Sequence, residues 1–216
     1  PPTSSHVLPP RPHTIYPAHQ AAAAARNDEE RARAAEERRR NPPTHMPDEF
    51  MRGGGCFGPT ATVQLVDETH THGGVRTATV AEVRAGDILV GEGGRRAAVR
   101  CVVLTPCPGG RALLTRLPNG TELTEWHPVR DPTGRWRFPH MLGERVLVRA
   151  SHVHNFVLAP GHPTVLVGGV PCAALGHGLD APTVAHPYWG TSAVITDLMS
   201  KPGWESGRVV LEHTTA

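Results

Sequence analysis

From residue 60 onward, short apolar runs rich in valine and leucine alternate with glycine, proline and aspartate. Runs of this length bounded by turn-forming residues are typical of β-strands rather than helices. The pattern predicts ten strands, at residues 62–66, 77–80, 87–90, 98–105, 112–117, 121–124, 145–148, 154–158, 164–167 and 170–173. Asn119-Gly120 separates two of these runs, and this pair favours the left-handed backbone of a tight hairpin. We therefore predict an all-β fold of many short strands.

Two helices are expected outside this strand pattern. Residues 20–40 combine an alanine run with acidic residues that precede basic ones, which predicts a charged linker helix that ends before Asn41-Pro42-Pro43. Residues 192–200 predict a second, short C-terminal helix, capped by Thr191 or Ser192 and halted by Lys201-Pro202-Gly203. The first helix has almost no large apolar side chain, so we expect it to be solvated.

The composition divides the chain into three parts. Residues 1–52 form a linker that begins with a Pro- and His-rich stretch too polar to bury a core and continues as the charged helix. Residues 53–178 carry the strand pattern. Residues 179–216 form a C-terminal extension whose aromatic and aliphatic residues predict packing onto the β core. Because the sequence begins with proline, we expect it to be part of a longer protein.

Charge and cysteine content narrow the possible partners. The net charge is +2, from 22 basic and 20 acidic residues, which gives no support to a nucleic-acid partner. No apolar stretch approaches the roughly 18 residues of a membrane span. The four cysteines form no CxxC pair, which slightly favours a reducing, intracellular setting, although the location is otherwise unknown. We expect a monomer without a cofactor.

The candidate chemistry begins at Cys56, which directly follows Gly53-Gly54-Gly55 and opens the strand-patterned region. A thiol with an unhindered glycyl carbonyl immediately upstream is placed to attack its own peptide bond. The expected substrate is therefore the chain itself. A buried cysteine that only fills space is the alternative interpretation of this residue taken alone.

Several short motifs occur in a fixed order in the strand-patterned region. The GCF motif at 55–57, the segment 80–89 and the TEWH motif at 124–127 resemble the Hint superfamily of hedgehog autoprocessing domains and inteins. Further segments resemble the Vint group, Hint domains attached to von Willebrand A-type domains. These segments are WHPV at 126–129, FP at 138–139, HNFVL at 154–158, GH at 161–162, LGHG at 175–178 and HPYWGT at 186–191. The resemblance covers about residues 53–212.

The resemblance implies a mechanism for particular residues. Cys56 would attack the Gly55 carbonyl in an N-to-S acyl shift, and His127 would protonate the departing Cys56 nitrogen. Thr124 would polarise the Gly55 carbonyl or hold His127 in register. His162 matches the histidine of a late motif and would support the site. The ordinary alternatives are a packed structural imidazole for His127, a strand hydroxyl for Thr124 and a hydrogen-bonded structural histidine for His162.

The end of the strand-patterned region indicates how the expected thioester would be resolved. Splicing inteins end in a His-Asn pair, whereas residues 167–174 carry alanines there, so protein splicing is not expected. Single-site cleavage remains, with the thioester resolved by water or by a small external nucleophile. Sterol transfer has no support, because no equivalent of the activating aspartate is found. The alternative function is a non-reactive Hint-shaped interaction module of a von Willebrand-type or ubiquitin-ligase protein.

The remaining cysteines and the 14 histidines are given structural roles. Cys101, Cys107 and Cys172 are expected to be buried thiols, although Cys107 could instead accept the acyl group from Cys56 or pair with Cys101. No Cys/His set has the spacing of a structural zinc site, so no metal is expected.

Overall fold

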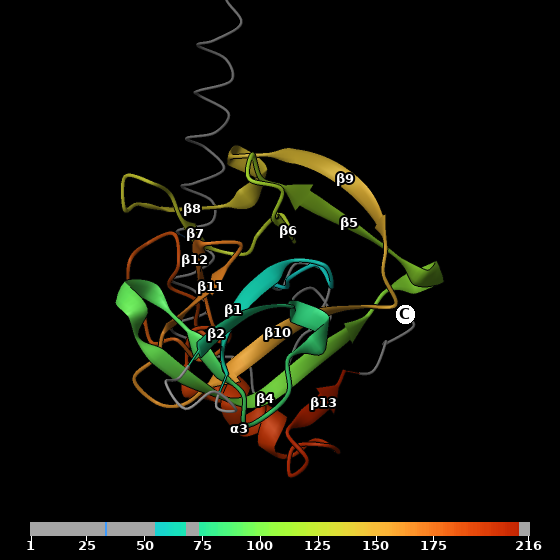
Figure 1. Cartoon of the computed structure of the whole chain (residues 1–216), viewed down its shortest axis with the longest axis vertical. Coiled ribbons are helices and arrows are strands. Elements are labelled where there is room, and N and C mark those ends of the chain that lie inside the picture. The colour runs from blue at the N-terminus through green and yellow to red at the C-terminus, as the bar shows by residue number, and fades with distance from the viewer. Residues whose placement is uncertain (1–32, 34–54, 68–73, 212–216) are drawn as a thin grey trace, which may run out of the picture.

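The computed structural model describes residues 33, 55–67 and 74–211 (Figure 1). The expected linker, with its helix at about 20–40, lies outside the described residues apart from Arg33, which is helical and exposed. Residues 1–52, 53–178 and 179–216 therefore remain a proposed division of the chain.

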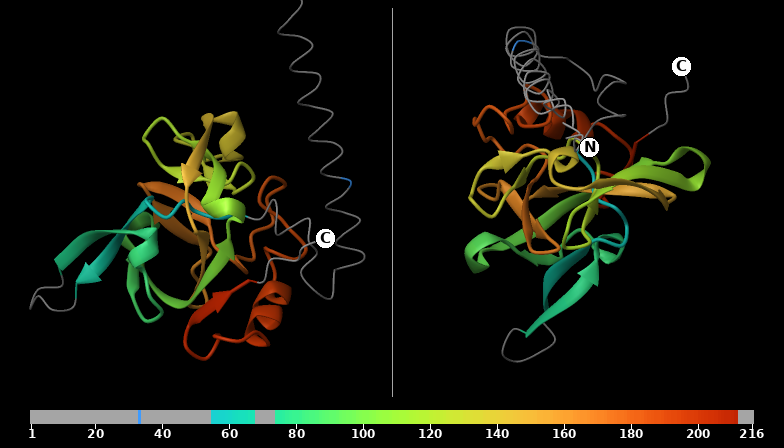
Figure 2. Two further views of the ribbon diagram at one scale, coloured as in Figure 1. Left: turned by 90° about the vertical axis from the view of Figure 1, so that its right-hand side faces the viewer. Right: turned by 90° about the horizontal axis from the view of Figure 1, so that it is seen from above.

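The described strands form three sheets. In spatial order, the first contains β10 (His152–Leu158), β4 (Arg96–Pro106), β3 (Ile88–Val90), β1 (Thr62–Asp67) and β2 (Gly74–Thr79), with β13 (Arg208–Val210) also paired to β4. The second contains β11 (Thr164–Val167), β12 (Val170–Ala173), β7 (Val129–Arg130) and β8 (Trp136–Arg137). The third contains β6 (Glu122–Leu123), β5 (Arg111–Arg116) and β9 (Glu144–Arg149). Figure 2 shows these sheets from two further sides.

Helical segments are short within the described residues. The α-helix α3 (Ser192–Met199) begins after Thr191, whose side chain accepts a hydrogen bond from the Ala193 amide. Four 3-10 turns complete the list: η1 (Val80–Glu82), η2 (Glu92–Gly94), η3 (Pro108–Gly110) and η4 (Pro139–Met141).

The expected all-β fold with a short C-terminal helix is confirmed. One expected strand, 77–80, ends a residue early because Glu82 accepts hydrogen bonds from the Thr79 amide and hydroxyl, at 2.7 and 2.6 Å, and this starts η1 at Val80. The sequence pattern missed β7, β8 and β13, which have only two or three residues each. Such short strands cannot show an alternation of polar and apolar positions.

The long strand β4 is the centre of the fold. It pairs with β3 at its start, with β10 over its later residues and with β13 in parallel (Figure 1). Because successive side chains of a strand point to opposite faces, the β4–β10 pair has two distinct sides. Val102 lies opposite Phe156 on one side, and Val103 lies opposite Asn155 on the other.

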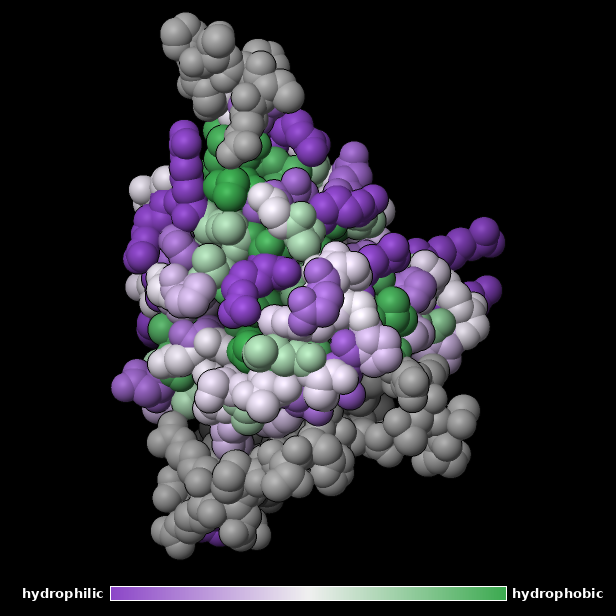
Figure 3. Space-filling model, turned by 90° about the horizontal axis from the view of Figure 1, so that it is seen from below, coloured by the Kyte–Doolittle hydropathy of each residue, from purple (hydrophilic) through white to green (hydrophobic). Residues whose placement is uncertain are grey.

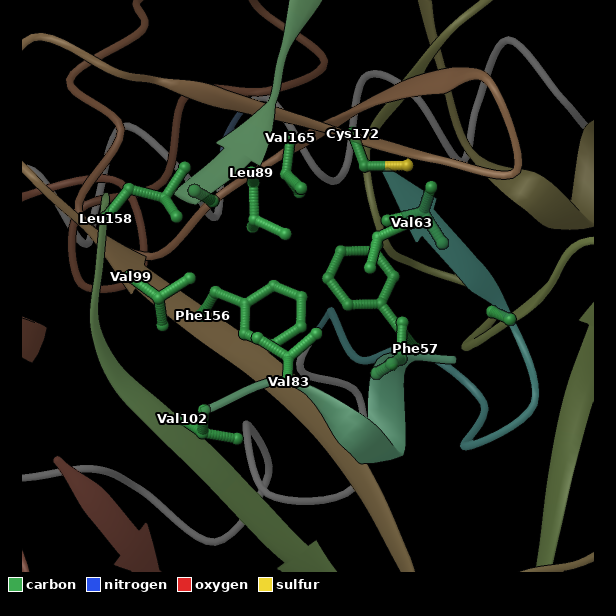
Figure 4. Close-up of a cluster of buried hydrophobic side chains, with 14 of the residues drawn as sticks. Phe57, Val63, Val83, Leu89, Val99, Val102, Phe156, Leu158, Val165 and Cys172 are labelled. Carbon is green, nitrogen blue, oxygen red and sulfur yellow. The ribbon is translucent and has the colours of Figure 1, made fainter. Parts of the chain in front are cut away.

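The first side of this pair faces the main core, a cluster that includes Phe57, Leu89, Val102 and Phe156. Figure 4 shows the rings of Phe57 and Phe156 pointing toward one another among Val, Leu and Cys172 side chains. Their ring centroids are 5.7 Å apart. Burial of aromatic and aliphatic side chains of this kind supplies most of the stabilisation of a small β domain.

The second side carries two smaller clusters. The C-terminal cluster joins Cys101, Val103 and Val157 to side chains from the end of the chain, including Tyr188, Val194, Leu198 and Val209. The other, the β5–β9 cluster, joins Cys56, Leu114 and Val153, with Cys107, Ala112, Val146 and Val148 partly buried against it. The strip of β4 and β10 between the two clusters carries Thr105 and Asn155.

The surface is mixed in character. In the view from below, hydrophilic and hydrophobic residues are interspersed over the face shown (Figure 3), in keeping with a net charge of +2 from nearly balanced charges. Within the described part of the chain, no helix has both the length and the apolar character needed to cross a membrane.

Candidate active site

The segment around Cys56 is anchored by the residue that follows it. Phe57 forms antiparallel bridges with both Leu123 and His154. Its amide donates to the His154 carbonyl at 2.7 Å, and the His154 amide donates back at 3.0 Å. The ring of Phe57 is fully buried in the main core. The Gly55–Cys56 peptide is therefore attached to a fixed point of the core.

Thr124 contacts the amide nitrogen of the Gly55–Cys56 peptide. The Cys56 amide donates to Thr124 Oγ1 at 2.9 Å, and the Thr124 amide donates to the Cys56 carbonyl at 2.9 Å. The Thr124 hydroxyl also approaches that carbonyl, at 3.4 Å. Thr124 thus holds the Cys56 nitrogen with its side chain, while its own carbonyl accepts from the His127 amide at 3.1 Å and fixes the turn that leads to His127.

The carbonyl of the same peptide has a different partner. Asn155 Nδ2 donates a short hydrogen bond to the Gly55 oxygen. The other end of the Asn155 amide accepts from the Phe156 amide at 2.7 Å, which fixes the orientation of the side chain. Asn155 is only 4% exposed. A buried, oriented N–H group at a carbonyl oxygen is suited to stabilise negative charge on that oxygen.

His127 lies next to Gly55 and is 1% exposed. Its Nε2 lies 2.9 Å from the Ala173 carbonyl, and because a carbonyl only accepts, Nε2 carries the hydrogen. Its Nδ1 has no hydrogen-bond partner among the described residues. A methyl group added to Gly55 would lie 2.8 Å from this Nδ1, so glycine allows the imidazole to approach the backbone closely.

The thiol of Cys56 points to the other side of the segment. Its Sγ lies 3.8 Å from Thr105 Oγ1, in the strip between the two smaller clusters. The ring of His127 instead packs against Phe57, with centroids 4.3 Å apart, on the side of the main core. Sulfur and imidazole therefore approach the Gly55–Cys56 peptide from different directions.

Burial keeps the Cys56 thiol and the His127 imidazole neutral near pH 7. It raises the pKa of the Cys56 thiol to about 12, an effect that the Thr105 hydroxyl opposes and a charge on Cys107 increases. It lowers the pKa of His127 to about 4; the hydrogen bond to Ala173 opposes this effect, and a charge on His177 adds to it. The resting site thus contains a thiol and a neutral imidazole with a free lone pair on Nδ1.

Four of the five residues predicted for the site, Gly55, Cys56, Thr124 and His127, lie together. His162 lies in the loop between β10 and β11, next to Gly161, and its support of the site stays a prediction. A different histidine, His177, is near enough to His127 to influence its pKa.

Sequence reasoning missed the contribution of Asn155. The available signal was an amide beside His154 in a strand that is otherwise apolar from Val153 to Leu158. Buried amides persist in such strands when they have a specific hydrogen-bond partner.

The other cysteines differ in their surroundings. Cys101 and Cys172 are fully buried in the C-terminal cluster and the main core, whereas Cys107 is partly exposed beside Cys56. Within residues 55–67 and 74–211, no group of three or more His, Cys, Asp or Glu side chains is placed to hold a metal ion.

An all-β fold in which a buried cysteine follows a glycine and is surrounded by threonine, histidine and asparagine defines a candidate self-processing domain. A family model described as Vint, a Hint domain, matches residues 55–216. The chain belongs to this family of Hint domains.

Solved structures that are similar to the chain include the gp41-1 intein and a substituted variant of it, each 14% identical to this chain and with TM-scores of 0.37 and 0.38. Each match covers 56% of this chain, and 98% and 99% of the respective intein chain. No curated protein matches the chain.

The burial of His127 predicts a pH-dependent stability. Its pKa is about 4 in the folded protein and about 6.5 when unfolded, so the unfolded state binds the proton more tightly. The stabilisation is complete above pH 6.5 and is lost as the pH falls toward 4, by at most roughly 3 kcal/mol from this residue.

The measurement is urea denaturation between pH 7.5 and 4.5 in a Cys56→Ala background, which keeps the chain intact. Adding His127→Gln is expected to reduce the loss of unfolding free energy on acidification. An unchanged loss would show that His127 is not the group responsible.

Proposed function

We propose that this domain cleaves its own chain at the Gly55–Cys56 peptide by an N-to-S acyl shift. The observation that supports the proposal most directly is that three side chains surround this one peptide group. Asn155 donates to its carbonyl, Thr124 accepts from its amide, and His127 Nδ1 lies against Gly55. Membership in the Hint family supports the same chemistry.

The bonds change as follows. The Cys56 sulfur attacks the Gly55 carbonyl carbon, a new C–S bond forms, and negative charge develops on the carbonyl oxygen beside Asn155. The C–N bond to Cys56 then breaks and leaves a thioester and a free α-amine. The thiol loses one proton and the nitrogen gains one, so no net proton exchange with solvent is needed.

His127 is suited to deliver that proton. Because its Nε2 hydrogen is held by Ala173, its Nδ1 lone pair can take up a proton and pass it to the Cys56 nitrogen. The low pKa of His127 makes its protonated form a strong acid, which favours rapid donation. Thr124 fixes the direction of the Cys56 N–H at 2.9 Å, so the nitrogen keeps one orientation while its bond to Gly55 weakens.

The second step releases the upstream segment. Water, or an external nucleophile such as an amine or a thiol, attacks the thioester and restores the Cys56 thiol. The products are an upstream polypeptide ending at Gly55 and a domain that begins at Cys56. The substrate is the protein's own chain, and each molecule reacts once.

One observation favours the alternative of a non-reactive interaction module. A thiol that is 8% exposed and has a pKa of about 12 is a poor nucleophile unless its proton is removed within the site. Replacing Cys56 distinguishes the two functions, because only an interaction module would tolerate the replacement without consequence.

The first prediction tests cleavage itself. The intact chain incubated with hydroxylamine is expected to split between Gly55 and Cys56, because hydroxylamine traps a thioester as the hydroxamate. Intact mass spectrometry identifies both fragments. Cys56→Ala should stay full length, and Cys101→Ala, which removes a buried thiol in the C-terminal cluster, should cleave at the parent rate. A full-length, hydroxylamine-resistant parent chain would leave the interaction module as the function.

A second prediction concerns the oxyanion contact of Asn155. Asn155→Ala is expected to slow hydroxylamine-induced cleavage about 100-fold or more, as the loss of an oxyanion donor does in other acyl-transfer sites. Asn119→Ala removes an amide on an exposed hairpin turn and should react at the parent rate. Thermal denaturation of both variants checks that they are folded. A rate for Asn155→Ala within threefold of the parent would remove Asn155 from the mechanism.

A third prediction follows from the two pKa values. Transfer of the thiol proton within the site gives a thiolate and an imidazolium whose combined population does not depend on pH between about 4 and about 12. The cleavage rate at saturating hydroxylamine is therefore expected to stay flat between about pH 6 and 9. A rate that rises tenfold per pH unit would instead show that solvent hydroxide removes the proton and that His127 does not.

A further inference from the structure

Cys107 lies beside the candidate nucleophile although the two are far apart in sequence. Both cysteines belong to the β5–β9 cluster, where Cys56 is buried and Cys107 is partly buried against it. A charge on Cys107 raises the pKa of Cys56, in keeping with this shared cluster.

Both sulfurs also contact one residue of β4. The Cys56 sulfur lies 3.8 Å from the Thr105 hydroxyl, and the Cys107 sulfur lies 3.9 Å from the Thr105 carbonyl oxygen. Thr105, at the end of β4, therefore lies between the two thiols, with its hydroxyl toward Cys56 and its carbonyl toward Cys107.

The backbone of Cys107 is fixed at this place. Its amide donates to the Ser151 carbonyl at 2.9 Å, and its own carbonyl accepts from the Gly110 amide at 3.0 Å. Prolines on both sides restrict it further. The turn η3 then leads into β5, so Cys107 lies where β4 passes into the antiparallel pair of β5 and β9 (Figure 1).

The two thiols differ in their access to solvent. Cys56 is covered by Leu114 of β5 and Val153 of β10, so a thioester on its sulfur would be shielded from an external nucleophile. Cys107 is partly exposed. A Cys56 thioester also lies next to the α-amine that the shift releases, and re-formation of the amide is strongly favourable.

We propose that Cys107 takes the acyl group from Cys56 in a second, sulfur-to-sulfur transfer and presents it to the external nucleophile. The inference rests on the acyl shift proposed above. The Cys107 sulfur forms a bond to the Gly55 carbonyl carbon, and the bond from that carbon to the Cys56 sulfur breaks. The proton that Cys107 loses passes to the Cys56 sulfur. One thioester replaces another, and nothing is oxidised or reduced.

The transfer to Cys107 would overcome two problems of the Cys56 thioester, its nearness to the α-amine and its shielding from external nucleophiles. It moves the acyl group away from the α-amine of Cys56, which slows the return to the peptide. It also moves the acyl group to the more exposed of the two sulfurs, where water or an amine can reach it.

The experiment uses the full chain and follows the position of the acyl group. Samples taken during spontaneous cleavage are quenched in acid, digested and analysed by tandem mass spectrometry. We expect a peptide ending at Gly55 joined through sulfur to the peptide that contains Cys107. Finding the upstream segment joined only to Cys56 would overturn the proposal.

Variants at Cys107 provide an independent measurement. Cys107→Ala is expected to slow spontaneous release at least tenfold, yet to cleave at molar hydroxylamine, because a small nucleophile at high concentration still reaches the Cys56 thioester. Cys107→Ser should accumulate an oxygen ester at position 107. Cys101→Ala, in the strand β4 that leads to Cys107, is the matched control and should release at the parent rate.

The outcomes separate this inference from the acyl shift on which it rests. If Cys107→Ala matches the parent in spontaneous release, Cys107 is not an acceptor, while the acyl shift stands. If neither chain cleaves in hydroxylamine, the acyl shift and the transfer to Cys107 both fall.

Discussion

The attachment of Phe57 to the core is the constraint on which the candidate site depends. One residue after the proposed cleavage point, its backbone is paired with His154 and bridged to Leu123, and its ring is buried against Phe156. A peptide bond at a free chain end would sample many orientations. Here the Gly55–Cys56 group is brought to a fixed place, and each of its polar atoms meets a particular side chain.

The same burial that fixes the peptide also determines its electrostatics. Both Cys56 and His127 are nearly inaccessible to water, so their charged forms are disfavoured, and the resting site is neutral. A neutral thiol and a neutral imidazole cost little to bury together, whereas a thiolate–imidazolium pair is unfavourable until the reaction consumes it. For the proposed reaction, this arrangement would let the domain fold before it reacts, because the thiolate–imidazolium form would be present only briefly.

The sequence predicted the parts of the molecule that depend on local pattern. The strands at 164–167 and 170–173 have the predicted bounds; the first lies between Pro163 and Gly168, and the second begins directly after Gly169. Cys56, Thr124 and His127 were predicted as site residues because their motifs are short and occur in a fixed order. The contacts of Asn155 and Cys107 could not be predicted in this way. They depend on the pairing of Phe57 with His154 and on the register of β10 with β4, which join distant segments. For the same reason, only the folded chain shows that His177 lies near enough to His127 to influence its pKa.

The two sides of the β4–β10 pair explain how the fold combines a rigid core with the strip that carries the candidate site. Phe156 and Val102 belong to the main core, while Asn155 and Thr105 occupy the opposite side with Cys56. On that side the strip is bordered by the C-terminal cluster at one end and the β5–β9 cluster at the other. Side chains from residues 179–211 and from the β5–β9 pair therefore exclude water from the polar groups between them, which strengthens the hydrogen bond from Asn155 to Gly55. The β5–β9 pair thus has two effects on the proposed reaction: it would keep the site dry enough for this contact to polarise the carbonyl, and it would limit the approach of any external nucleophile to the sulfur of Cys56.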